Sequence, residues 1–578
     1  MTTVVYYQLN SPDEPAIKTL EDPMNKTRAL LLLAIPVILW IALPVSAQVS
    51  QQLKSQVTAE LKQRTLRQQP ATSLVTETDD LVVHKNVVYS KVGDRNLHMD
   101  IFQPRTVSNA PVVMVIHGGG WLKGSKDKFH PLARYLAQYG FVTAAVEYRL
   151  GTEALFPAAI QDCNTATRFL RKASKQYSID PTRIGAIGGS AGGHLVGLMA
   201  TSGSNPELLG TTHADYSSAL QSAIVLAGPL DLLTGPVAEK SLNMPTQSNS
   251  NKWIGKTVAE DPATYKLASP VYHINAQTCP THFLLGEHDS PERNIASRHA
   301  LTKLGIPSRL HVYRFGLHGC WNSGPWFYPL ADDAARLFGR DLKTELATRP
   351  LQSGENITHI TNHHEHLLLS TTARQDGKIS IPRYHARIGL TYLKGDPKKT
   401  PLKVTPEIDH WDISIPPDAR ANAEIIMELL DPAVAGALPS VVAQQGDSPI
   451  NLNAHFAETY GEKLRFEPQP HKNTIGYWVN PEDWCRWRIY VETPGTYDLT
   501  IHQGCGKGHG GSEVAINSAG QVIEFIVEDT GHFQNFKPRT VGQFRFDKPG
   551  VYNIDIRPIK KAKVAIMDVR LMELKLRK

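Results

Sequence analysis

The 578-residue sequence has few cysteines, a single long apolar run and no strong excess of charge of one sign. Five cysteines in a chain of this length exclude a disulfide-rich scaffold, and none of them has the spacing of zinc ligands. Lysine and arginine exceed aspartate and glutamate by 61 to 55, without a basic run, so we expect no nucleic acid partner. With 41% hydrophobic and 20% charged residues, the chain is not intrinsically disordered and can form more than one core.

The long apolar run covers residues 29–43, after two basic residues and before the small residues that end at Ala47. This pattern is typical of a secretory signal peptide, and the run is short for a membrane span. We therefore expect cleavage after Ala47, a secreted or periplasmic protein and no stable membrane anchor. Residues 1–47 would then be the signal peptide preceded by an N-terminal extension from a misassigned start, and residues 48–80 a glutamine-rich linker.

Between residues 81 and 346, short β-branched runs alternate with amphipathic segments. Two strands flanking Gly93 and Asp94 predict a hairpin. Further strands are predicted at 112–116, 141–146, 183–187, 223–226, 282–285 and 310–313, and helices at 129–139, 158–173, 191–200, 294–304 and 330–346. Apolar strands interleaved with amphipathic helices predict a doubly wound α/β domain, with a mostly parallel sheet covered on both faces.

The glycine-rich motif GGSAGG begins at Gly188, between a predicted strand and a predicted helix. Gly188 and Gly192 lie two positions either side of Ser190 and allow a tight turn that lifts the serine hydroxyl above the sheet. The N-terminus of the following helix stabilises negative charge near that hydroxyl. A plain glycine turn has the same pattern, but the strand-to-helix position favours Ser190 as a nucleophile.

A second glycine motif, HGGGW, begins at His117 directly after a predicted strand. Its glycines allow the backbone to bend so that the N–H groups of Gly118 and Gly119 point inward. Together with the N–H of Ala191 they form a predicted oxyanion hole, supported by His117 and Gly120. The alternative is a structural glycine turn, which the serine motif downstream makes a poorer explanation.

An acid and a base follow two later strands. Asp289 comes after the strand at 282–285, and His318 after the strand at 310–313, so the chain order is Ser, Asp, His, as in α/β-hydrolases. In these roles His318 takes the proton of Ser190 and Asp289 orients the imidazole. Three neighbours remain as alternatives: the carboxylates Glu287 and Glu292 and the base His288.

Together these motifs resemble the esterase branch of the α/β-hydrolases, especially the bacterial feruloyl/acetyl esterase-like (BD-FAE / carboxylesterase-like) enzymes. Other shared features are EYRL at 147–150, Phe156-Pro157 with Asp162, and SIDP at 178–181. The resemblance implies hydrolysis of a carboxylic ester through an acyl-enzyme, with no metal or organic cofactor. The segment after Asp289 departs from the family, because SPER at 290–293 replaces a small, apolar continuation.

Past residue 346 the α/β alternation stops. Residues 355–440 contain short alternating runs broken by proline and aspartate, which predicts a small antiparallel β-sandwich, similar to one that trails some secreted glycosidases. The cluster NHHEH at 362–366 contains possible metal ligands. Histidine clusters this short are more often solvated, so we predict no metal there.

Residues 447–576 have a second β pattern. Alternation along one predicted strand places four residues on a core face: Cys485, Trp487, Ile489 and Val491. The opposite face of that strand carries Trp484, Arg486, Arg488 and Tyr490. Cys485 and Cys505 lie in the same segment and are candidates for a disulfide.

This last segment resembles the jelly-roll carbohydrate-binding modules of secreted glycan-degrading enzymes. The resemblance implies aromatic stacking on sugar rings, for which Trp478 and Trp484 are candidates, although core packing is the more common role of any single tryptophan in such a segment. It also implies a possible structural calcium near Glu458 and Asp568, although two oxygens do not make a calcium site.

We therefore predict an exported serine esterase that removes acetyl or feruloyl groups from plant or algal polysaccharide, or from small esters released from it. Trp121, the last residue of the HGGGW motif, and Trp321, which follows shortly after His318, are further candidates for substrate contact. A general carboxylesterase for lipophilic esters is the first alternative, but its expected apolar lid is not found in the polar insertion at 232–257. A glycan-binding protein on an inactive hydrolase scaffold and a peptidase with the same triad are the others.

The signal-peptide assignment predicts a mature N-terminus at Gln48. Mass spectrometry of the protein recovered outside the cytoplasm should detect the peptide that starts there. Detection of Met1 or Met24 as the N-terminus of that material would contradict the assignment.

Overall fold

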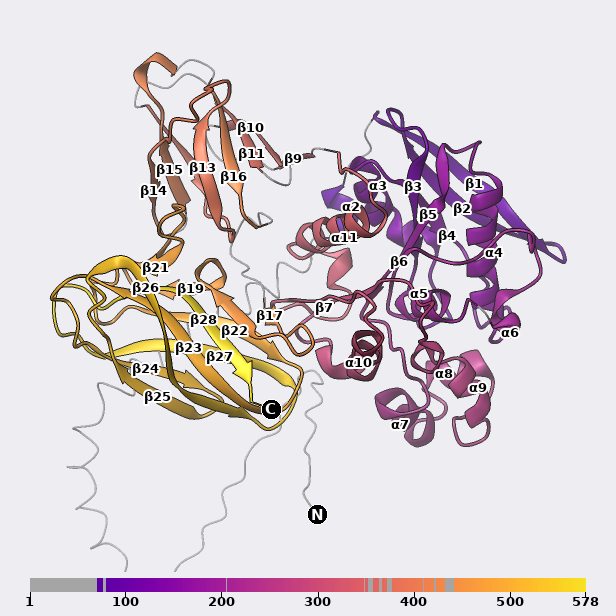
Figure 1. Ribbon diagram of the computed structural model, residues 1–578. Coiled ribbons are helices and arrows are strands. Elements are labelled where there is room, and N and C mark those ends of the chain that lie inside the picture. The colour runs from indigo at the N-terminus through magenta and orange to yellow at the C-terminus, as the bar shows by residue number, and fades with distance from the viewer. Residues whose placement is uncertain are drawn as a thin grey trace, which may run out of the picture. The chain divides into compact units, whose positions relative to one another are not determined.

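The computed structural model describes residues 70–75, 79–203, 205–347, 349–351, 357–362, 366–371, 377–408, 410–419, 423–431 and 441–577 (Figure 1). The expected signal peptide and residues 363–365 of the histidine cluster lie outside these ranges. Within them, no helix has the length and apolarity needed to cross a membrane.

An eight-stranded sheet, in the order β1-β2-β4-β3-β5-β6-β7-β8, forms the first part of the described chain. Its strands are β1 (Leu81–Val92), β2 (Arg95–Pro104), β3 (Ala110–Ile116), β4 (Val142–Val146), β5 (Ile179–Gly189), β6 (Ser222–Leu226), β7 (Thr281–Gly286) and β8 (Leu310–Tyr313). β2 pairs antiparallel with β1 and β4, and the other strands pair in parallel. The predicted doubly wound α/β fold is confirmed.

Helices cover both faces of this sheet (Figure 1). α3 (His130–Gln138) and α11 (Phe327–Asp341) lie on one face, and α4 (Ala158–Lys172) and α5 (Ala191–Thr201) on the other. The remaining helices are α2 (Ala71–Leu74), α6 (Pro206–Leu209), α7 (Gly235–Asn243), α8 (Asn249–Ile254), α9 (Pro262–Leu267) and α10 (Ile295–Lys303). The 3-10 turns here are η1 (Lys126–Phe129), η2 (Pro270–His273), η3 (Pro291–Asn294) and η4 (Cys320–Asn322).

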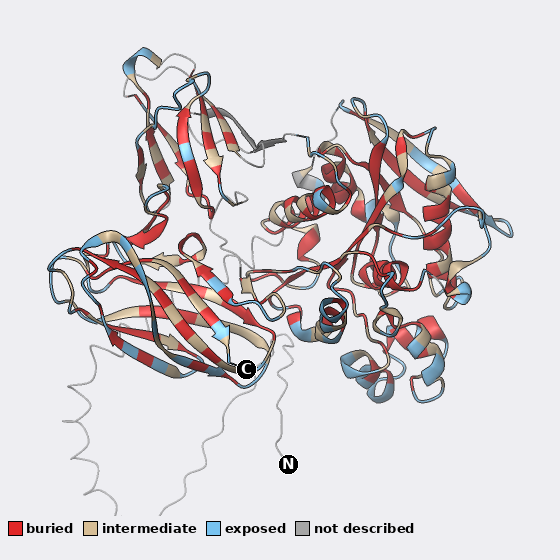
Figure 2. Ribbon diagram, viewed as in Figure 1, coloured by how far each residue is buried: buried red, intermediate tan, exposed pale blue. Residues whose placement is uncertain are grey.

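The central strand β3 explains why both faces need cover. All seven of its residues are buried, as Figure 2 shows for most of the sheet. Val113 and Val115 join the core beneath α3 and α11, whereas Met114 and Ile116 join the core beneath α4 and α5. A strand without polar positions is stable only between two helical layers.

One stretch of the expected linker is part of the fold. α2 contacts α3, Ala71 belongs to the core beneath α3 and α11, and Pro70 pairs with Ser323 in an isolated bridge. Residues 70–75 therefore pack against α3 and the turn η4 of the α/β domain.

Two antiparallel sheets follow, one of five strands (β13-β16-β11-β10-β9) and one of three (β12-β15-β14). Their strands are β9 (Arg349–Leu351), β10 (Ile357–Asn362), β11 (His366–Thr371), β12 (Lys378–Pro382), β13 (Ile388–Leu393), β14 (Val404–Pro406), β15 (His410–Ser414) and β16 (Glu424–Leu429), with the turn η5 (Pro417–Ala419). Alternate residues such as Leu367, Ile379, Trp411 and Ile425 are fully buried. The period of two read from the sequence thus marks the inner faces.

The last part of the chain consists of two six-stranded sheets. One contains β17 (Val442–Ala443), β19 (Glu458–Tyr460), β22 (Trp484–Val491), β24 (Glu513–Ser518), β25 (Gln521–Ile526) and β27 (Gly550–Lys560). The other contains β18 (Ile450–Asn453), β20 (Arg465–Glu467), β21 (Thr474–Gly476), β23 (Gly495–Cys505), β26 (His532–Phe546) and β28 (Asp568–Leu576). The turn η6 (Ala454–Phe456) lies between β18 and β19. We call residues 441–577 the C-terminal β unit.

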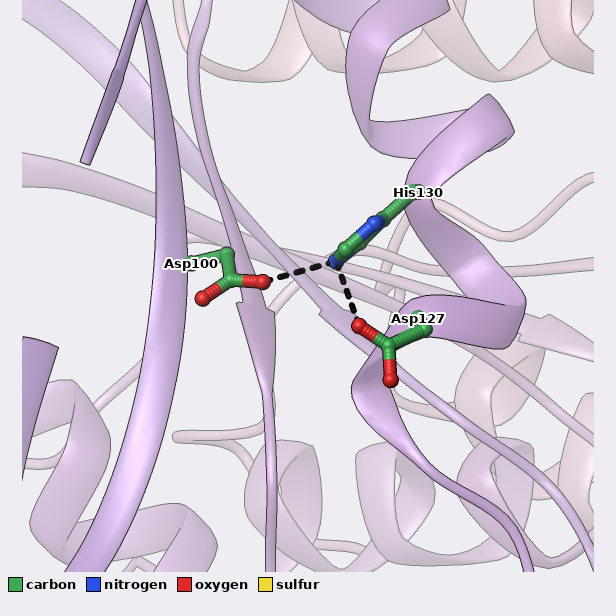
Figure 3. A group of neighbouring side chains, drawn as sticks. All are labelled: Asp100, Asp127 and His130. Atoms are coloured by element: carbon green, nitrogen blue, oxygen red, sulfur yellow. Dashed lines mark ion pairs between the residues drawn. The ribbon is translucent and has the colours of Figure 1, made fainter. Parts of the chain in front are cut away.

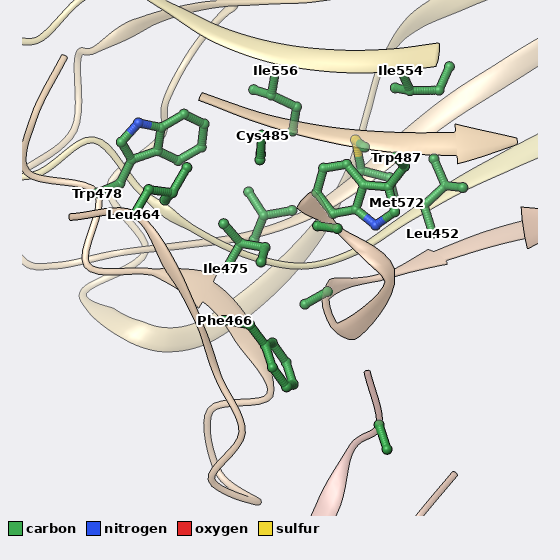
Figure 4. Packing of buried hydrophobic residues seen from close by; sticks show 14 of the residues in the cluster. Leu452, Leu464, Phe466, Ile475, Trp478, Cys485, Trp487, Ile554, Ile556 and Met572 are labelled. Atoms are coloured by element: carbon green, nitrogen blue, oxygen red, sulfur yellow. The ribbon is translucent and has the colours of Figure 1, made fainter. Parts of the chain in front are cut away.

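The core of the C-terminal β unit lies between its two sheets (Figure 4). Cys485 and Trp487 of β22 and Ile556 of β27 come from one sheet, and Met572 of β28 comes from the other. The core face predicted for β22 is therefore confirmed.

The opposite face of β22 is covered as well, which corrects the predicted sugar-stacking surface. Trp484 is only 2% exposed, because its ring is stacked on Tyr460 at 4.0 Å and under the guanidinium of Arg557 at 3.5 Å. Trp478 is fully buried and donates from Nε1 to the Asp483 carbonyl. Neither tryptophan offers a ring face to a polysaccharide.

Two further expectations for this segment differ from the structure. All five cysteines are buried free thiols, so Cys485 and Cys505 do not form a disulfide. Glu458 lies in one sheet and accepts a hydrogen bond from Tyr460, whereas Asp568 lies in the other sheet, where it and Glu467 both face Gly476. The two carboxylates named for calcium thus have different surroundings.

Burial, together with the carboxylate of Glu467, raises the pKa of Asp568 to about 8. A carboxyl group with a raised pKa keeps its proton in the folded state, so the free energy of unfolding falls as the pH rises from about 4 to about 8. We expect Asp568→Asn to raise Tm relative to the native chain by at least about 2 °C at pH 8 and above, and by less towards pH 4. Thermal unfolding at several pH values measures this.

The matched control is Asp547→Asn, because the side chain of Asp547 is 78% exposed. Its effect on Tm should vary little over the same pH range. A Tm difference for Asp568→Asn that stays constant with pH would mean that Asp568 is already ionised at neutral pH.

Candidate active site

Ser190 occupies a strained turn between β5 and α5. Its φ of 57° and ψ of −120° are unfavourable for a residue with a side chain, and its N–H donates to the Leu226 carbonyl at 2.8 Å. A Cβ at Gly188 would lie 2.4 Å from the Gly192 carbonyl oxygen, and one at Gly192 would lie 2.2 Å from the Ile116 carbonyl oxygen. Both glycines are therefore required by close backbone contacts, which explains the spacing of the motif.

The structure brings Ser190, His318 and Asp289 into one hydrogen-bonded chain. Nε2 of His318 lies 2.9 Å from Oγ of Ser190, and Nδ1 of His318 lies 2.8 Å from Oδ2 of Asp289. The three residues follow β5, β7 and β8, whose carboxyl ends meet at one edge of the sheet. Asp289 is buried, whereas half of the His318 side chain is exposed and accessible to a substrate.

The alternative carboxylate Glu287 has a different partner. It forms a bidentate ion pair with Arg488, and its carboxylate also lies 3.4 Å from Nε2 of His288. Asp289 is thus the carboxylate in contact with His318. This geometry allows a serine hydroxyl to lose its proton to an imidazole whose orientation a buried carboxylate maintains.

The HGGGW loop packs directly against the serine turn. A Cβ at Gly118 would lie 2.4 Å from the Gly189 carbonyl oxygen and 3.1 Å from Cβ of Ser190. Gly119 has a φ of 137°, and its carbonyl accepts hydrogen bonds from the next turn of the loop. Ala191 is the first residue of α5, so its N–H has no partner within the helix. These backbone groups adjoin the space above Ser190, where the predicted oxyanion hole would lie.

Within this loop, His117 and Gly120 are fixed by contacts with neighbouring residues. The His117 ring is stacked on Tyr148 at 4.4 Å, and its backbone carbonyl accepts a hydrogen bond from the Tyr148 hydroxyl at 2.9 Å. Burial lowers the pKa of His117, which favours the neutral ring. Gly120 has a φ of 60° and a Cβ there would collide with Asn249.

The predicted substrate contacts of Trp121 and Trp321 are corrected to structural ones. Trp121 is 6% exposed, is stacked on Trp253 at 5.0 Å and donates from Nε1 to Nδ1 of His194. Trp321 is 3% exposed and packs edge to face against His318 at 5.2 Å. Both rings fix catalytic loops and leave little surface for a ligand.

His194 and Trp253 belong to this support and were missed by sequence reasoning. Burial lowers the pKa of His194 to about 4, so the ring is neutral and accepts from Trp121, while its Nε2 bonds the Ala268 carbonyl at 2.7 Å. Nothing in the local sequence distinguishes such residues from ordinary core positions.

Asp100, Asp127 and His130 form the group with metal-ligand spacing in the described part of the chain (Figure 3). Nε2 of His130 lies 2.9 Å from Oδ2 of Asp100 and 3.5 Å from Oδ1 of Asp127. The ammonium group of Lys126 donates to the same Asp100 oxygen at 2.9 Å. Because a lysine already neutralises the carboxylate, the group is an ion-pair network and does not fit a metal ion.

Comparison with protein families identifies two stretches. Residues 99–304 match the BD-FAE family model. This stretch contains the glycine motifs, Ser190 and Asp289, while His318 lies just beyond it. Residues 449–577 match the model of a domain of unknown function, DUF5077.

Curated relatives match a little over a third of the chain. The probable carboxylic ester hydrolase LipM of Mycobacterium tuberculosis is 32% identical over 215 residues, which make up 36% of this chain and 48% of that protein. Esterase LipQ of the same organism is 29% identical over 218 residues, 37% of this chain and 50% of that protein. The chain spans about half the length of these relatives.

Among solved structures, a truncated carbohydrate esterase from gut microbiota overlays 47% of this chain and all of its own, with 21% identity and a TM-score of 0.41. A thermophilic esterase of Thermogutta terrifontis overlays 46% of this chain and 96% of its own, with 25% identity and a TM-score of 0.38.

Gly119 lies in a tightly packed part of the HGGGW loop. A Cβ at Gly119 would lie 1.7 Å from the Lys123 carbonyl oxygen, at a φ that side chains rarely adopt. Gly119→Ala must therefore displace the loop, and with it the predicted oxyanion donors. Because loss of one such donor costs about 100- to 1000-fold in kcat, we expect a fall of that order in ester hydrolysis.

Gly203→Ala is the matched control, since a Cβ at Gly203 would meet no atom within 4 Å. It should leave kcat within about twofold of the native value. A Gly119→Ala variant with native kcat would show that this loop does not serve the transition state.

Proposed function

We propose that this protein is a carboxylic ester hydrolase in which Ser190, His318 and Asp289 act through an acyl-enzyme. The observation that carries the proposal is the continuous hydrogen-bonded chain from Ser190 Oγ through the His318 ring to Asp289. The match to the BD-FAE family and to curated proteins named esterases supports it.

The proposed reaction follows from the positions of these groups. Oγ of Ser190 attacks the ester carbonyl while Nε2 of His318 takes its proton, and the oxyanion is stabilised by backbone N–H groups of Gly118, Gly119 and Ala191. The protonated His318 then gives the proton to the leaving alcohol. A water molecule, activated by the same imidazole, hydrolyses the acyl-serine and restores the enzyme.

For the substrate, we propose acetyl or feruloyl esters carried on polysaccharides or on oligosaccharides derived from them. The half-exposed side chain of His318 supports a site open to a bulky alcohol group. The insertion that contains α7 and α8 is mostly polar, with buried Ser250 and Asn251 forming hydrogen bonds there. This polarity favours a sugar-bearing ester over a lipid.

One observation favours the alternative of a general carboxylesterase. Leu242 and Met244, on the same insertion, are 52% and 44% exposed. Two exposed apolar side chains are common on protein surfaces, so we rank this alternative second. A panel of acetylated oligosaccharide, feruloylated oligosaccharide and long-chain esters separates the two, because the highest kcat/KM identifies the class.

A non-catalytic role as a glycan-binding protein is less well supported. Such a role relied on exposed tryptophan rings for stacking on sugars, and Trp478 and Trp484 are both buried. A protein that only binds glycans would also not need three catalytic groups in hydrogen-bond contact. We further propose that the protein acts outside the cytoplasm, for which the signal-like pattern at residues 29–47 is the support.

Ser190→Ala should abolish ester hydrolysis, with a loss of about a millionfold in kcat, because the nucleophile is removed. Asp289→Asn should lose less, about ten-thousandfold, because the wrong imidazole tautomer is then stabilised. Turnover of a soluble acetyl ester measures both.

Ser217→Ala, at an exposed serine, is the control and should retain native turnover. Thermal unfolding of Ser190→Ala should remain close to that of the native chain. Native turnover in Ser190→Ala would show that another residue is the nucleophile.

A further inference from the structure

Strand β22 of the C-terminal β unit is connected by an ion pair to the loop that carries Asp289. We call residues 287–291, from the end of β7 to the first residue of η3, the acid loop. Two arginines lie on either side of it: Arg488 on β22 contacts its first residue, and Arg298 on α10 contacts its last. Both contacts lie within one compact unit of the chain, residues 64–578.

The contact between Arg488 and Glu287 is a buried, bidentate ion pair. Nε and Nη2 of Arg488 donate to Oε2 and Oε1 of Glu287 at 2.9 and 2.5 Å, and the Glu287 side chain is only 1% exposed. Nη1 of Arg488 donates to Asn553 on β27 at 3.2 Å, which fixes the guanidinium from its own sheet. A bidentate pair of this kind restricts both the distance and the orientation of the carboxylate.

The second contact holds the other end of the acid loop. Nη2 of Arg298 donates to the Pro291 carbonyl at 2.9 Å, and Nε of Arg298 donates to Glu492 at 2.6 Å. Glu492 directly follows β22, and Tyr490 of β22 packs in the core of the α/β sheet. Nη2 of Arg298 also donates to the Tyr490 hydroxyl at 3.4 Å, so the residues on both sides of Asp289 are connected to β22.

The acid loop is also attached to the loop that carries His318. The N–H of Glu287 donates to the Tyr313 carbonyl at 3.0 Å, and the N–H of His288 donates to the Gly316 carbonyl at 2.9 Å. The guanidinium of Arg488 lies 5.6 Å above the ring of Phe315, in that same loop. A displacement of Glu287 would thus be transmitted to both partners of the His318–Asp289 hydrogen bond.

We propose that Arg488 is a positioning residue for the catalytic acid: through Glu287 it fixes the acid loop so that Asp289 holds His318 in line with Ser190. This inference rests on the function proposed above for Asp289. It makes the C-terminal β unit a part of the catalytic apparatus, because the side chain that completes the site comes from a strand about 200 positions further along the chain.

The test uses the full chain and a soluble acetyl ester. Arg488→Met removes the bidentate arginine partner of the buried Glu287 carboxylate and leaves it, among the described residues, only the His288 ring at 3.4 Å, so we expect the acid loop to move to hydrate it. A displacement of about 1 Å at a catalytic group costs on the order of 100-fold, so we expect kcat to fall about 10- to 100-fold. KM should stay within about twofold, because neither Arg488 nor Glu287 touches the substrate.

A second variant, Arg488→Met with Glu287→Gln, covers the case in which Arg488→Met folds poorly. It removes the unpaired charge and should recover most of the loss in Tm, while kcat remains at least about tenfold low because the loop is no longer held. Arg488→Lys keeps the positive charge but cannot form the bidentate contact with Glu287. Its kcat should lie between those of Arg488→Met and the native chain.

The matched control is Arg486→Met. Arg486 lies on the same face of β22 and forms an equally short bidentate pair, but with Asp555 inside the C-terminal β unit. Its loss should lower Tm to a similar extent and leave kcat within about twofold. Titration of Ser190 with a phosphonylating reagent gives the concentration of competent sites, so that kcat is calculated per active site.

A purely structural role for Arg488 would reduce the number of titratable sites and leave turnover per site unchanged. That result, in both Arg488→Met and the double variant, would overturn the proposal while leaving the esterase function intact. A native chain without ester hydrolysis, or a Ser190→Ala variant with native turnover, would overturn the proposed function and this inference with it.

Discussion

The catalytic edge of the sheet depends on the close approach of backbone segments around Ser190. The carbonyl oxygens of Ile116, Gly189 and Gly192 all lie where a side chain on a neighbouring glycine would have to be. This crowding holds the strained serine conformation in place, because the turn cannot relax without pushing β3 or α5 aside. The geometry of Ser190 relative to His318 and Asp289 follows from that constraint and from the shared direction of β5, β7 and β8.

Much of this arrangement could be predicted from the sequence, because its causes are local. The change between periods of two and 3.6 predicted the eight strands of the α/β sheet and the helices α3, α4, α5, α10 and α11 to within about five residues. It did not predict the short helices α2, α6, α7, α8 and α9. The spacing of Gly188, Ser190 and Gly192 indicated a strand-to-helix turn, and chain order then pointed to Asp289 and His318. In parallel sheets, strand ends identify which loops converge, so these three residues could be brought together without coordinates.

The rest could not be predicted, because it depends on contacts between segments distant in the sequence. Alternation correctly divided β22 into two faces, but did not reveal that the second face is covered as well. Trp484, a candidate for sugar stacking, and Tyr490 on the same face are therefore both buried. In the same way, nothing near Glu287 in the sequence indicates Arg488 as its partner.

The ion pair between Glu287 and Arg488 also bears on how this chain evolved. Domains that fold independently are usually joined through exposed linkers that few contacts cross. Here Glu287 and Arg488 lie in segments that match different families, yet each side chain is desolvated in the presence of the other. Recombination that replaced one segment would leave a buried unpaired charge, so the two segments are expected to have been inherited as a pair.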